Sequence, residues 1–361
     1  WLVTARAGAR LHLGSRLTMS ACNVSVVIPT YNRASLLRRA LNSVAQQTAK
    51  PSEVIIVDDC SETEILEQVN SIASDFSKLL NVRLITNERN RGANHSRNKG
   101  ISAATGHYIA FLDSDDLWLP RKLERQLEEI KKAEAISDKP VLSATGRYRV
   151  DDRGEIFARQ FGGCVLNGQK IRRSNFIGTL SSVIVESGIA RQVHGFNEAL
   201  PASQDWDFFI RLSDYVQYVG VAEPLCIYVD HTRDRITLDY RKKLRGHIAI
   251  YRNHVRPLKG AASTTGAEFL RNIAEDYQEL GNKSKAAFFY ASALSRDLRF
   301  CGPMQPLIEC ALSAFFRVFS PPRLKQQRYR RYRRAMDQLL RDNTINATIN
   351  NDRSIIQQLM A

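Results

Sequence analysis

Short apolar, β-branched runs alternate with amphipathic segments between residues 24 and 135. Such runs, when Pro, Asn, Gly or Asp residues bound them, are typical of buried strands. We expect strands over 24–32, 53–59, 82–86 and 107–113. The amphipathic segments place apolar residues on one helical face, which predicts helices over 33–48, 62–79, 92–105 and 119–135.

This alternation predicts an α/β fold, with a mainly parallel central sheet and helices on both faces. In such sheets ligands bind outside the carboxyl ends of the strands. Acidic and other candidate binding residues gather at that edge: Pro29, Thr30 and Tyr31 close the first strand, Asp58 and Asp59 the second, and Asp113, Ser114, Asp115 and Asp116 the fourth.

The pattern changes after the fourth strand and helix. Residues 140–235 mix short strand-like and helical runs, which we assign to the same domain, and residues from about 240 onward are helical in pattern. The segment 267–300 predicts a helical hairpin with Gly281 at its turn. We therefore predict an α/β domain over 23–238 and a helical region with a basic tail over 239–361. Residues 1–22 fit no element and are expected to be a disordered or non-native extension.

The formal net charge of +15 favours anionic partners. Part of the excess lies in "RLKQQRYRRYRR" (323–334), which follows the apolar segment 306–320. This combination suits peripheral contact with an anionic membrane, but a solvated basic helix packed on the domain is an equal alternative. No nucleic-acid partner is expected, because no binding fold for one is recognisable. The chain has no apolar run of about 18 residues, so we predict no transmembrane helix and a cytoplasmic location, with any membrane contact at the inner face of the plasma membrane.

The acidic run "DSDD" (113–116) presents an electrostatic problem. Neighbouring carboxylates repel one another, and each loses hydration when buried. A divalent cation such as Mg²⁺ or Mn²⁺ would offset the repulsion, and Mg²⁺ usually binds one or two carboxylates together with substrate phosphates. The alternative is a solvated acidic loop that caps the following helix. Trp118 and Trp206 leave a similar choice, since either can stack on a sugar ring or belong to the core.

Five motifs resemble one family when they are taken together and in order. They are "VSVVIPTYNR", "VIIVDDCS", "NRGANHSRNKGI", "GHYIAFLDSDDLWLP" and "GFNEALPASQDWDFFIRL". Their sequence and spacing resemble the family 2 glycosyltransferases, which have the GT-A fold. The resemblance covers residues 23–235 and does not include the helical remainder.

The resemblance implies roles for individual residues. Asp59 matches the aspartate that hydrogen-bonds the nucleotide base, usually uracil, and Asp58 would support its loop. Asp115 matches the metal-binding member of the D-x-D pair. His231 is the last residue of "CIYVDH", where some relatives have a histidine that binds the metal, although a lone histidine is often an ordinary surface or core residue. The other nucleotide-sugar-binding positions are Pro29, Thr30, Tyr31, Arg97, Asp113 and Ser114.

Asp205 matches the catalytic base of the family, although Gln204 replaces the glutamate that usually precedes it. A base opposite a leaving diphosphate implies in-line displacement with inversion. We therefore expect a metal-dependent, inverting transferase that moves a sugar from a nucleotide-sugar, most simply a UDP-sugar, to a glycan or lipid-linked acceptor in bacterial surface polysaccharide synthesis. The alternatives are a nucleotidyltransferase and a non-catalytic binding protein built on a degenerate transferase domain.

Overall fold

The computed structural model describes residues 22–160, 162, 168–230, 239–256, 262–296 and 343–360. The first part comprises β1 (Cys22–Thr30), α1 (Ala34–Ala45), β2 (Pro51–Asp58), α2 (Thr63–Phe76), β3 (Val82–Thr86), α3 (Ala93–Ala103), β4 (Tyr108–Phe111), β5 (Leu117–Trp118) and α4 (Lys122–Glu134). The middle part comprises β6 (Val141–Asp151), β7 (Ile156–Gln160), α5 (Gly168–Arg173), η1 (Leu180–Ser182), β8 (Val183–Glu186), α6 (Ser187–Gln192), α7 (Gln204–Leu212) and β9 (Gln217–Asp230). The last part comprises α8 (Tyr240–Ile250), η3 (Tyr251–Val255), α9 (Ala262–Glu279), α10 (Lys283–Arg296) and α13 (Asn343–Met360).

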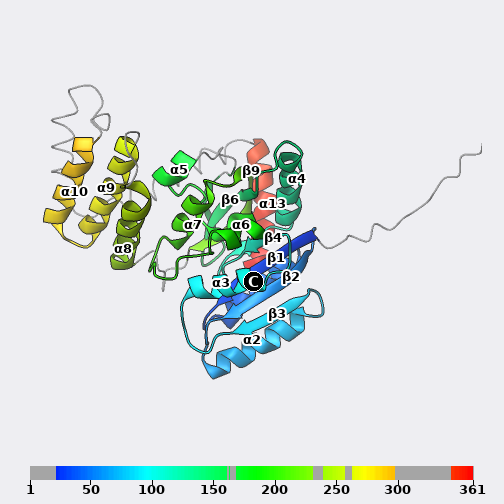
Figure 1. Cartoon of the computed structure of the whole chain (residues 1–361). Coiled ribbons are helices and arrows are strands. Elements are labelled where there is room, and N and C mark those ends of the chain that lie inside the picture. Colours follow the sequence, from blue (N-terminus) through cyan, green and yellow to red (C-terminus); the bar gives the residue numbers. More distant parts are fainter. Residues whose placement is uncertain are drawn as a thin grey trace, which may run out of the picture.

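The described strands form one twisted sheet in the order β3-β2-β1-β4-β8-β6-β9-β5, with β7 paired to β6 (Figure 1). Strands β1 to β4 are mutually parallel, as the alternation of strand and helix predicted. The other half is mixed, because β8 runs antiparallel to both β4 and β6, whereas β6 and β9 are parallel. The parallel half brings the ends of β1, β2 and β4 to one edge.

Helices cover both faces of the parallel half. Alternate residues of β1 point to opposite sides, so Val27 packs in one core with α3, α6 and α7. Val26 and Ile28 pack in the other core, with α1, α2 and α4. All three side chains are fully buried, which explains why these strands are apolar without interruption.

The C-terminal helices differ in where they lie. Helices α8, α9 and α10 stand together beside α5 and α7 (Figure 1). The predicted hairpin is α9–α10, and Gly281 has a φ of 75° at its turn. The apolar segment 306–320 and the basic segment 323–334 lie outside the described residues. No helix in the described ranges is both long and apolar enough to cross a membrane.

Helix α13 returns to the α/β domain instead of extending the other helices. Its buried residues Ile349, Ile356 and Leu359 pack against residues of β5, β6 and β9. Asp352 accepts a hydrogen bond from the hydroxyl of Tyr148, 2.6 Å away. An ion pair between Arg353 and Glu155 adds a contact to the β6–β7 hairpin. The last described helix therefore completes the packing of the outer half of the sheet.

Candidate active site

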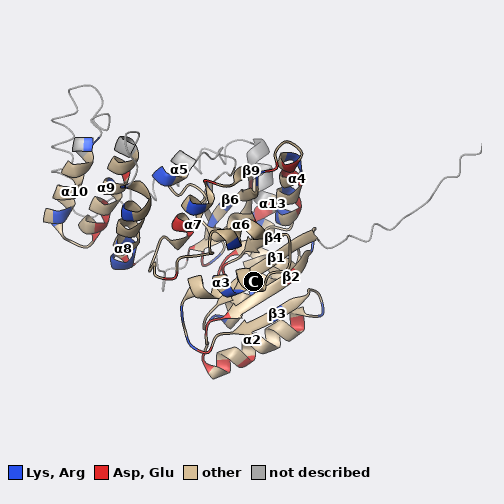
Figure 2. Cartoon of the chain, viewed as in Figure 1, with Lys and Arg blue, Asp and Glu red and all other residues tan. Residues whose placement is uncertain are grey.

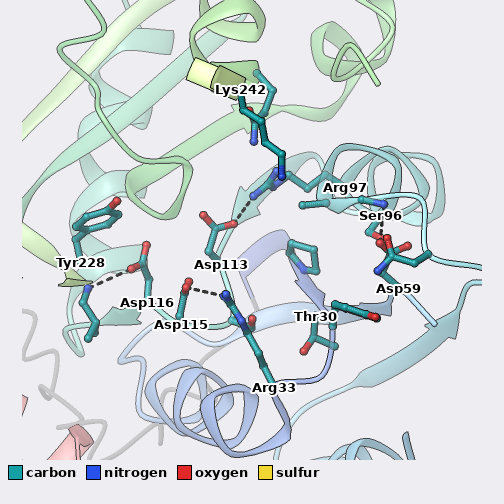
Figure 3. A pocket seen from close by; sticks show the side chains of 18 residues that line it. Thr30, Arg33, Asp59, Ser96, Arg97, Asp113, Asp115, Asp116, Tyr228 and Lys242 are labelled. Carbon is teal, nitrogen blue, oxygen red and sulfur yellow. Dashed lines mark hydrogen bonds and ion pairs between the residues drawn. The ribbon is translucent and has the colours of Figure 1, made fainter. Parts of the chain in front are cut away.

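A pocket of about 510 Å³ lies at the carboxyl ends of β1, β2 and β4 (Figure 3). Most residues that the sequence analysis assigned to the nucleotide-sugar site line it, namely Pro29, Thr30, Tyr31, Asp59, Arg97, Asp113 and Ser114, and so does Asp115, which was assigned to the metal. Arg97 comes from α3, whereas the others follow the ends of β1, β2 and β4, which the parallel register of the strands brings together.

Asp59 lies at the wall of this pocket, immediately after β2. Its Oδ1 accepts hydrogen bonds from Asn87 Nδ2 at 2.7 Å and from the backbone N–H of Arg91 at 3.0 Å. Its Oδ2 accepts from the N–H of Gly92 at 2.6 Å. A carboxylate offers about four acceptor positions, so one position on Oδ2 is left for a ligand N–H. The network fixes the carboxylate in place before any ligand binds.

Asp58 lies behind the pocket and does not line it. The side chain is fully buried, and it accepts hydrogen bonds from the N–H and the hydroxyl of Ser61, at 2.8 and 2.6 Å. The Ser61 hydroxyl in turn accepts from the N–H of Asn32 at 2.8 Å. Asp58 thus ties the β2 loop to the β1 loop through Ser61.

The three aspartates of the acidic run, Asp113, Asp115 and Asp116, have different environments. Asp113 pairs with Arg97 at 2.6 Å, and Asp115 pairs with Arg33 at 2.7 Å (Figure 3). Asp116 is 2% exposed and pairs with no arginine in the described contacts. Burial, followed by the neighbouring charges of Asp115 and Asp113, raises the pKa of Asp116 well above its ordinary value. The repulsion predicted for this run is therefore reduced by two ion pairs with arginines and by the raised pKa of the third carboxyl.

Asp116 also anchors the acidic loop to the rest of the sheet. Its Oδ2 accepts hydrogen bonds from the hydroxyls of Ser181 at 2.6 Å and Thr179 at 3.3 Å. Its Oδ1 accepts from the N–H of Val229 at 3.3 Å. The Ser181 hydroxyl accepts in turn from the N–H of Asp113 at 3.1 Å. Asp116 therefore positions the D-x-D pair through Ser181.

We expect Asp116→Ala to lower the free energy of unfolding by about 1–3 kcal/mol, because it removes a buried hydrogen-bond acceptor from this network. Asp116→Asn keeps both the size and the hydrogen-bonding capacity of the side chain, so its loss should be clearly smaller. Urea denaturation of the two variants beside the wild type measures the difference. Equal losses in both variants would show that the hydrogen bonds of Asp116 contribute nothing.

Asp205 lies in the first turn of α7, after Ser203, whose φ is 59°. Its Oδ2 accepts from Asn175 Nδ2 at 2.8 Å, and its Oδ1 accepts from the N–H of Trp206 at 2.8 Å. Burial raises the pKa of Asp205, and these two hydrogen bonds and the charge of Arg97 oppose that rise. Its neighbour Gln204, and not Asp205 itself, lines the pocket. A carboxyl with a raised pKa beside a polar pocket is suited to general-base work.

The two tryptophans belong to the core, so the sugar-stacking alternative was wrong. Trp118 is fully buried and donates from Nε1 to the carbonyl oxygen of Ser181 at 2.6 Å. Trp206 is 5% exposed and stacks on Phe269 with ring centroids 4.6 Å apart. The aromatic side chains that line the pocket are Tyr31 and Tyr228.

Sequence reasoning did not assign several residues that line the pocket. Arg33 belongs to the motif "VSVVIPTYNR", but the sequence analysis gave it no role. Lys242 comes from α8 and lies above Asp113 and Arg97 in Figure 3. Figure 2 marks further Lys and Arg positions in blue along the ribbons of α8 and α5. No local pattern connects Lys242 to a strand end more than a hundred residues earlier, so only the fold reveals it.

The residues present fit a divalent cation that shares its coordination with a substrate. In the described part of the chain no three His, Cys, Asp or Glu side chains form a ready metal site. His231 lies outside the described residues. The oxygens of Asp113 and Asp115 are the hard ligands that Mg²⁺ and Mn²⁺ take, and Mg²⁺ commonly uses one or two carboxylates with phosphates. A protein site completed by a phosphate ligand is therefore consistent with this donor set.

The pocket also contains buried polar atoms that lack a partner among the described residues. They are Nε and Nη1 of Arg97 and Oγ1 of Thr30. Buried polar groups normally form hydrogen bonds. Both residues line the pocket, so these atoms are available to a polar, anionic ligand.

Comparisons with known proteins identify the family to which this chain is similar. The model of glycosyl transferase family 2 matches residues 25–186. An uncharacterized glycosyltransferase of Haemophilus influenzae is 30% identical over 214 residues, which are 58% of this chain and 69% of the relative. The amylovoran biosynthesis glycosyltransferase AmsB of Erwinia amylovora is 30% identical over 230 residues, which are 60% of this chain and 72% of AmsB.

Solved structures share the fold. TarS 1–349 of S. aureus, in complex with UDP-GlcNAc, has a TM-score of 0.56 and 18% identity, covering 87% of this chain and 91% of TarS 1–349. The mannosyltransferase PcManGT of Pyrobaculum calidifontis, in complex with GDP-Man and Mn²⁺, has a TM-score of 0.50 and 17% identity, covering 87% of this chain and 86% of PcManGT. The GT-A fold expected from the motifs is thereby confirmed. With the family model and two relatives at 30% identity in agreement, this chain is a glycosyltransferase and belongs to glycosyltransferase family 2.

Proposed function

We propose that the protein transfers a sugar from a UDP-sugar to a hydroxyl of a glycan or lipid-linked acceptor, with the help of a divalent cation and with inversion at the sugar carbon. The observation that carries this proposal is the convergence of Asp59, Arg97 and the D-x-D pair on one pocket, with Asp205 beside it. A nucleotidyltransferase would also use an acidic metal site, but membership of the family favours sugar transfer.

The charges that line the pocket suit a metal–diphosphate pair. The pocket is lined by four carboxylates and three cations. The carboxylates are Asp59, Asp113, Asp115 and Asp116, and the cations are Arg33, Arg97 and Lys242. The two sets differ by a single charge and so are close to balance. A divalent cation alone or a diphosphate alone would upset that balance, whereas the two together nearly preserve it. We therefore assign the diphosphate to the basic residues and the metal to the acidic loop.

The base-binding end of the site is the Asp59 loop. The acceptor position left on Oδ2 suits a ring N–H, which uracil presents. TarS binds UDP-GlcNAc, whereas PcManGT binds GDP-Man, so the fold itself accepts more than one nucleotide. UDP is our proposal because of the single N–H that Asp59 can serve.

We assign the metal to Asp115, with Asp113 beside it and His231 as the further ligand. When bound, the cation would offset the charge that develops on the leaving diphosphate. Arg97 and Lys242 would bind the same group, and the buried Nε and Nη1 of Arg97 support this assignment. Asp113 and Ser114 would contact the ribose and sugar side of the donor.

Asp205 is the proposed base. It would take the proton from the acceptor hydroxyl as that oxygen attacks the sugar carbon from the side opposite the diphosphate. Asn175 and the N–H of Trp206 hold its carboxylate in a fixed orientation. A single base without a covalent sugar intermediate gives inversion, so an α-linked donor would yield a β-linked product.

The wider setting is also a proposal. AmsB acts in amylovoran biosynthesis, which supports a role in the assembly of a surface polysaccharide. We propose residues 23–238 as the catalytic domain and 239–361 as a helical C-terminal region with a basic tail. The reaction would take place in the cytoplasm, where nucleotide sugars are made, and the basic segment 323–334 would contact anionic lipid at the inner face of the membrane.

The test is calorimetric titration of UDP, GDP, CDP and dTDP into the purified protein, with and without Mn²⁺. We expect UDP to bind, and Mn²⁺ to increase its affinity, because the metal and the diphosphate share the acidic loop. Selective binding of another nucleotide would change the donor and keep the transferase. Absence of binding for all four would refute the nucleotide-sugar site.

A further inference from the structure

Arg33 occupies an unusual position in the pocket. It follows β1, and its Nη1 donates to Asp115 Oδ2 at 2.7 Å. The side chains of Arg33 and Asp115 are 37% and 23% exposed. Figure 3 shows the Arg33 side chain reaching from the α1 end of the pocket toward the acidic loop. The guanidinium therefore bonds the same carboxylate that we assign to the metal.

The backbone beside Arg33 is fixed, whereas its side chain is long. Asn32 has a φ of 50°, and its N–H donates to Ser61 Oγ at 2.8 Å. Asn32 Oδ1 also accepts from the N–H of Glu62 at 2.9 Å. The chain is thus anchored one residue before Arg33, at the edge of the pocket. From this anchored base the guanidinium can change partners without a movement of the backbone.

A guanidinium and a divalent cation compete for one carboxylate oxygen. They cannot both occupy the same side of Asp115 Oδ2, and their charges repel. Partly exposed ion pairs contribute little free energy, so a stronger ligand can displace Arg33. A displaced guanidinium then lies next to the diphosphate that accompanies the metal, and its planar set of donors matches phosphate oxygens.

We propose that Arg33 is an exchangeable counterion: it neutralises Asp115 before the donor binds, and transfers to the donor diphosphate when the metal takes Asp115. This inference rests on the metal and nucleotide site of the proposed function. It makes metal and nucleotide binding mutually dependent. The diphosphate draws Arg33 away from the metal site, and the metal releases Arg33 to bind the diphosphate. Free metal at the site would meet the positive charge of Arg33, whereas the metal–nucleotide complex supplies a new partner for it.

The substitution Arg33→Gln should change the two affinities in opposite directions. Binding of Mn²⁺ alone should become about fivefold tighter, as expected for the removal of a competing, partly exposed ion pair. Binding of UDP in the presence of Mn²⁺ should become about tenfold weaker or more, since a charged hydrogen bond to phosphate is lost. Electron paramagnetic resonance of free Mn²⁺ measures the first affinity, and calorimetry measures the second.

Arg38→Gln is the matched control. Arg38 lies on α1, which begins directly after Arg33; it pairs with Asp75 at 3.1 Å and does not line the pocket, so the same charge is lost at a distance. Neither affinity should change in this variant. The double variant Arg33→Gln/Asp115→Asn should lose the gain in Mn²⁺ affinity, because the gain depends on Asp115.

Several outcomes would overturn the exchange. Unchanged or weaker Mn²⁺ binding in Arg33→Gln would show that Arg33 does not compete with the metal at Asp115. If the affinities for Mn²⁺ and for UDP both fall, the substitution has damaged the loop instead of removing a competitor. Unchanged UDP binding would remove Arg33 from the diphosphate. If Arg38→Gln changes the two affinities as much as Arg33→Gln does, the cause is the change in the protein's net charge and not the position of Arg33. If the wild type binds Mn²⁺ but no nucleotide, the proposed function fails and the transfer to a diphosphate fails with it, while the Mn²⁺ comparison still decides whether Arg33 competes with the metal.

Discussion

Asp205→Asn will reduce turnover by about a thousandfold, within the range that a general base contributes, and will leave UDP affinity unchanged. The amide cannot accept the proton of the acceptor hydroxyl. Asp205 does not line the nucleotide pocket, so donor binding should not depend on its charge. Initial rates of sugar transfer together with calorimetry of UDP give both quantities for the same preparation.

The geometry defines the controls for this experiment. Asn175 Nδ2 donates to Asp205 Oδ2, and Asn175 Oδ1 accepts from the N–H of Gly178 at 3.0 Å. The new amide nitrogen would face Asn175 Nδ2, so thermal melting must show that the variant is folded. A folded variant that binds UDP and turns over at the wild-type rate would remove Asp205 as the base. A loss of UDP affinity would instead give Asp205 a part in donor binding.

The pH dependence follows from the direction of the pKa shift. Only ionised Asp205 can act as a base, and burial raises its pKa. The rate should therefore fall on the acid side at a higher pH than for an ordinary aspartate. Asn175 stabilises the ionised form, so Asn175→Ala should raise this pKa further and move the acid limb of kcat/KM to still higher pH.

The sequence predicted the parallel half of the fold because its signals are local. Apolar runs and helical periodicity marked β1 to β4 and α1 to α4, and the structure places those elements within a few residues of their predicted bounds. The two-residue strand β5 was not predicted. The half of the sheet with parallel and antiparallel pairs was not predicted in detail. Here β8 pairs with both β4 and β6, which precede it in the sequence by many residues. The pairing order of such strands depends on packing and not on any local pattern.

The same distinction separates the predicted and unpredicted parts of the site. Asp59 and Asp113 follow apolar strands directly, so the rule for parallel sheets located them. The cations that neutralise the acidic run could not be paired with it from sequence, because Arg33 and Asp115 are 82 positions apart. A metal was the only partner for the acidic run that reasoning from local sequence supplied. The fold supplies Arg33 and Arg97 as well, which is why the metal and the arginines must be considered together.

Ile356→Ala is expected to lower the free energy of unfolding by about 2–5 kcal/mol, the usual cost of removing a large aliphatic side chain from a packed core. The side chain of Ile356 is fully buried in the cluster that joins α13 to β5, β6 and β9. The sequence analysis assigned this stretch to the helical C-terminal region and did not predict that it packs on the sheet. Yet Ile349, Ile356 and Leu359 recur at intervals that place them on one face of a helix.

Gln357→Ala is the matched control, since Gln357 is the exposed neighbour of Ile356 on the same helix. Urea denaturation of both variants should show a large loss for Ile356→Ala and almost none for Gln357→Ala. Equal, small losses would mean that α13 does not cover the sheet in solution.

The packing of α13 also concerns the active site. Val229 belongs to the cluster that α13 covers, lines the pocket and donates its N–H to Asp116. A cavity at Ile356 should therefore loosen the strand that holds the acidic loop from behind. Hydrogen exchange at the end of β9 should increase in Ile356→Ala and stay at the wild-type level in Gln357→Ala. An increase confined to α13 would show instead that the helix is an independent cover, and that the acidic loop depends on Ser181 and Thr179 alone.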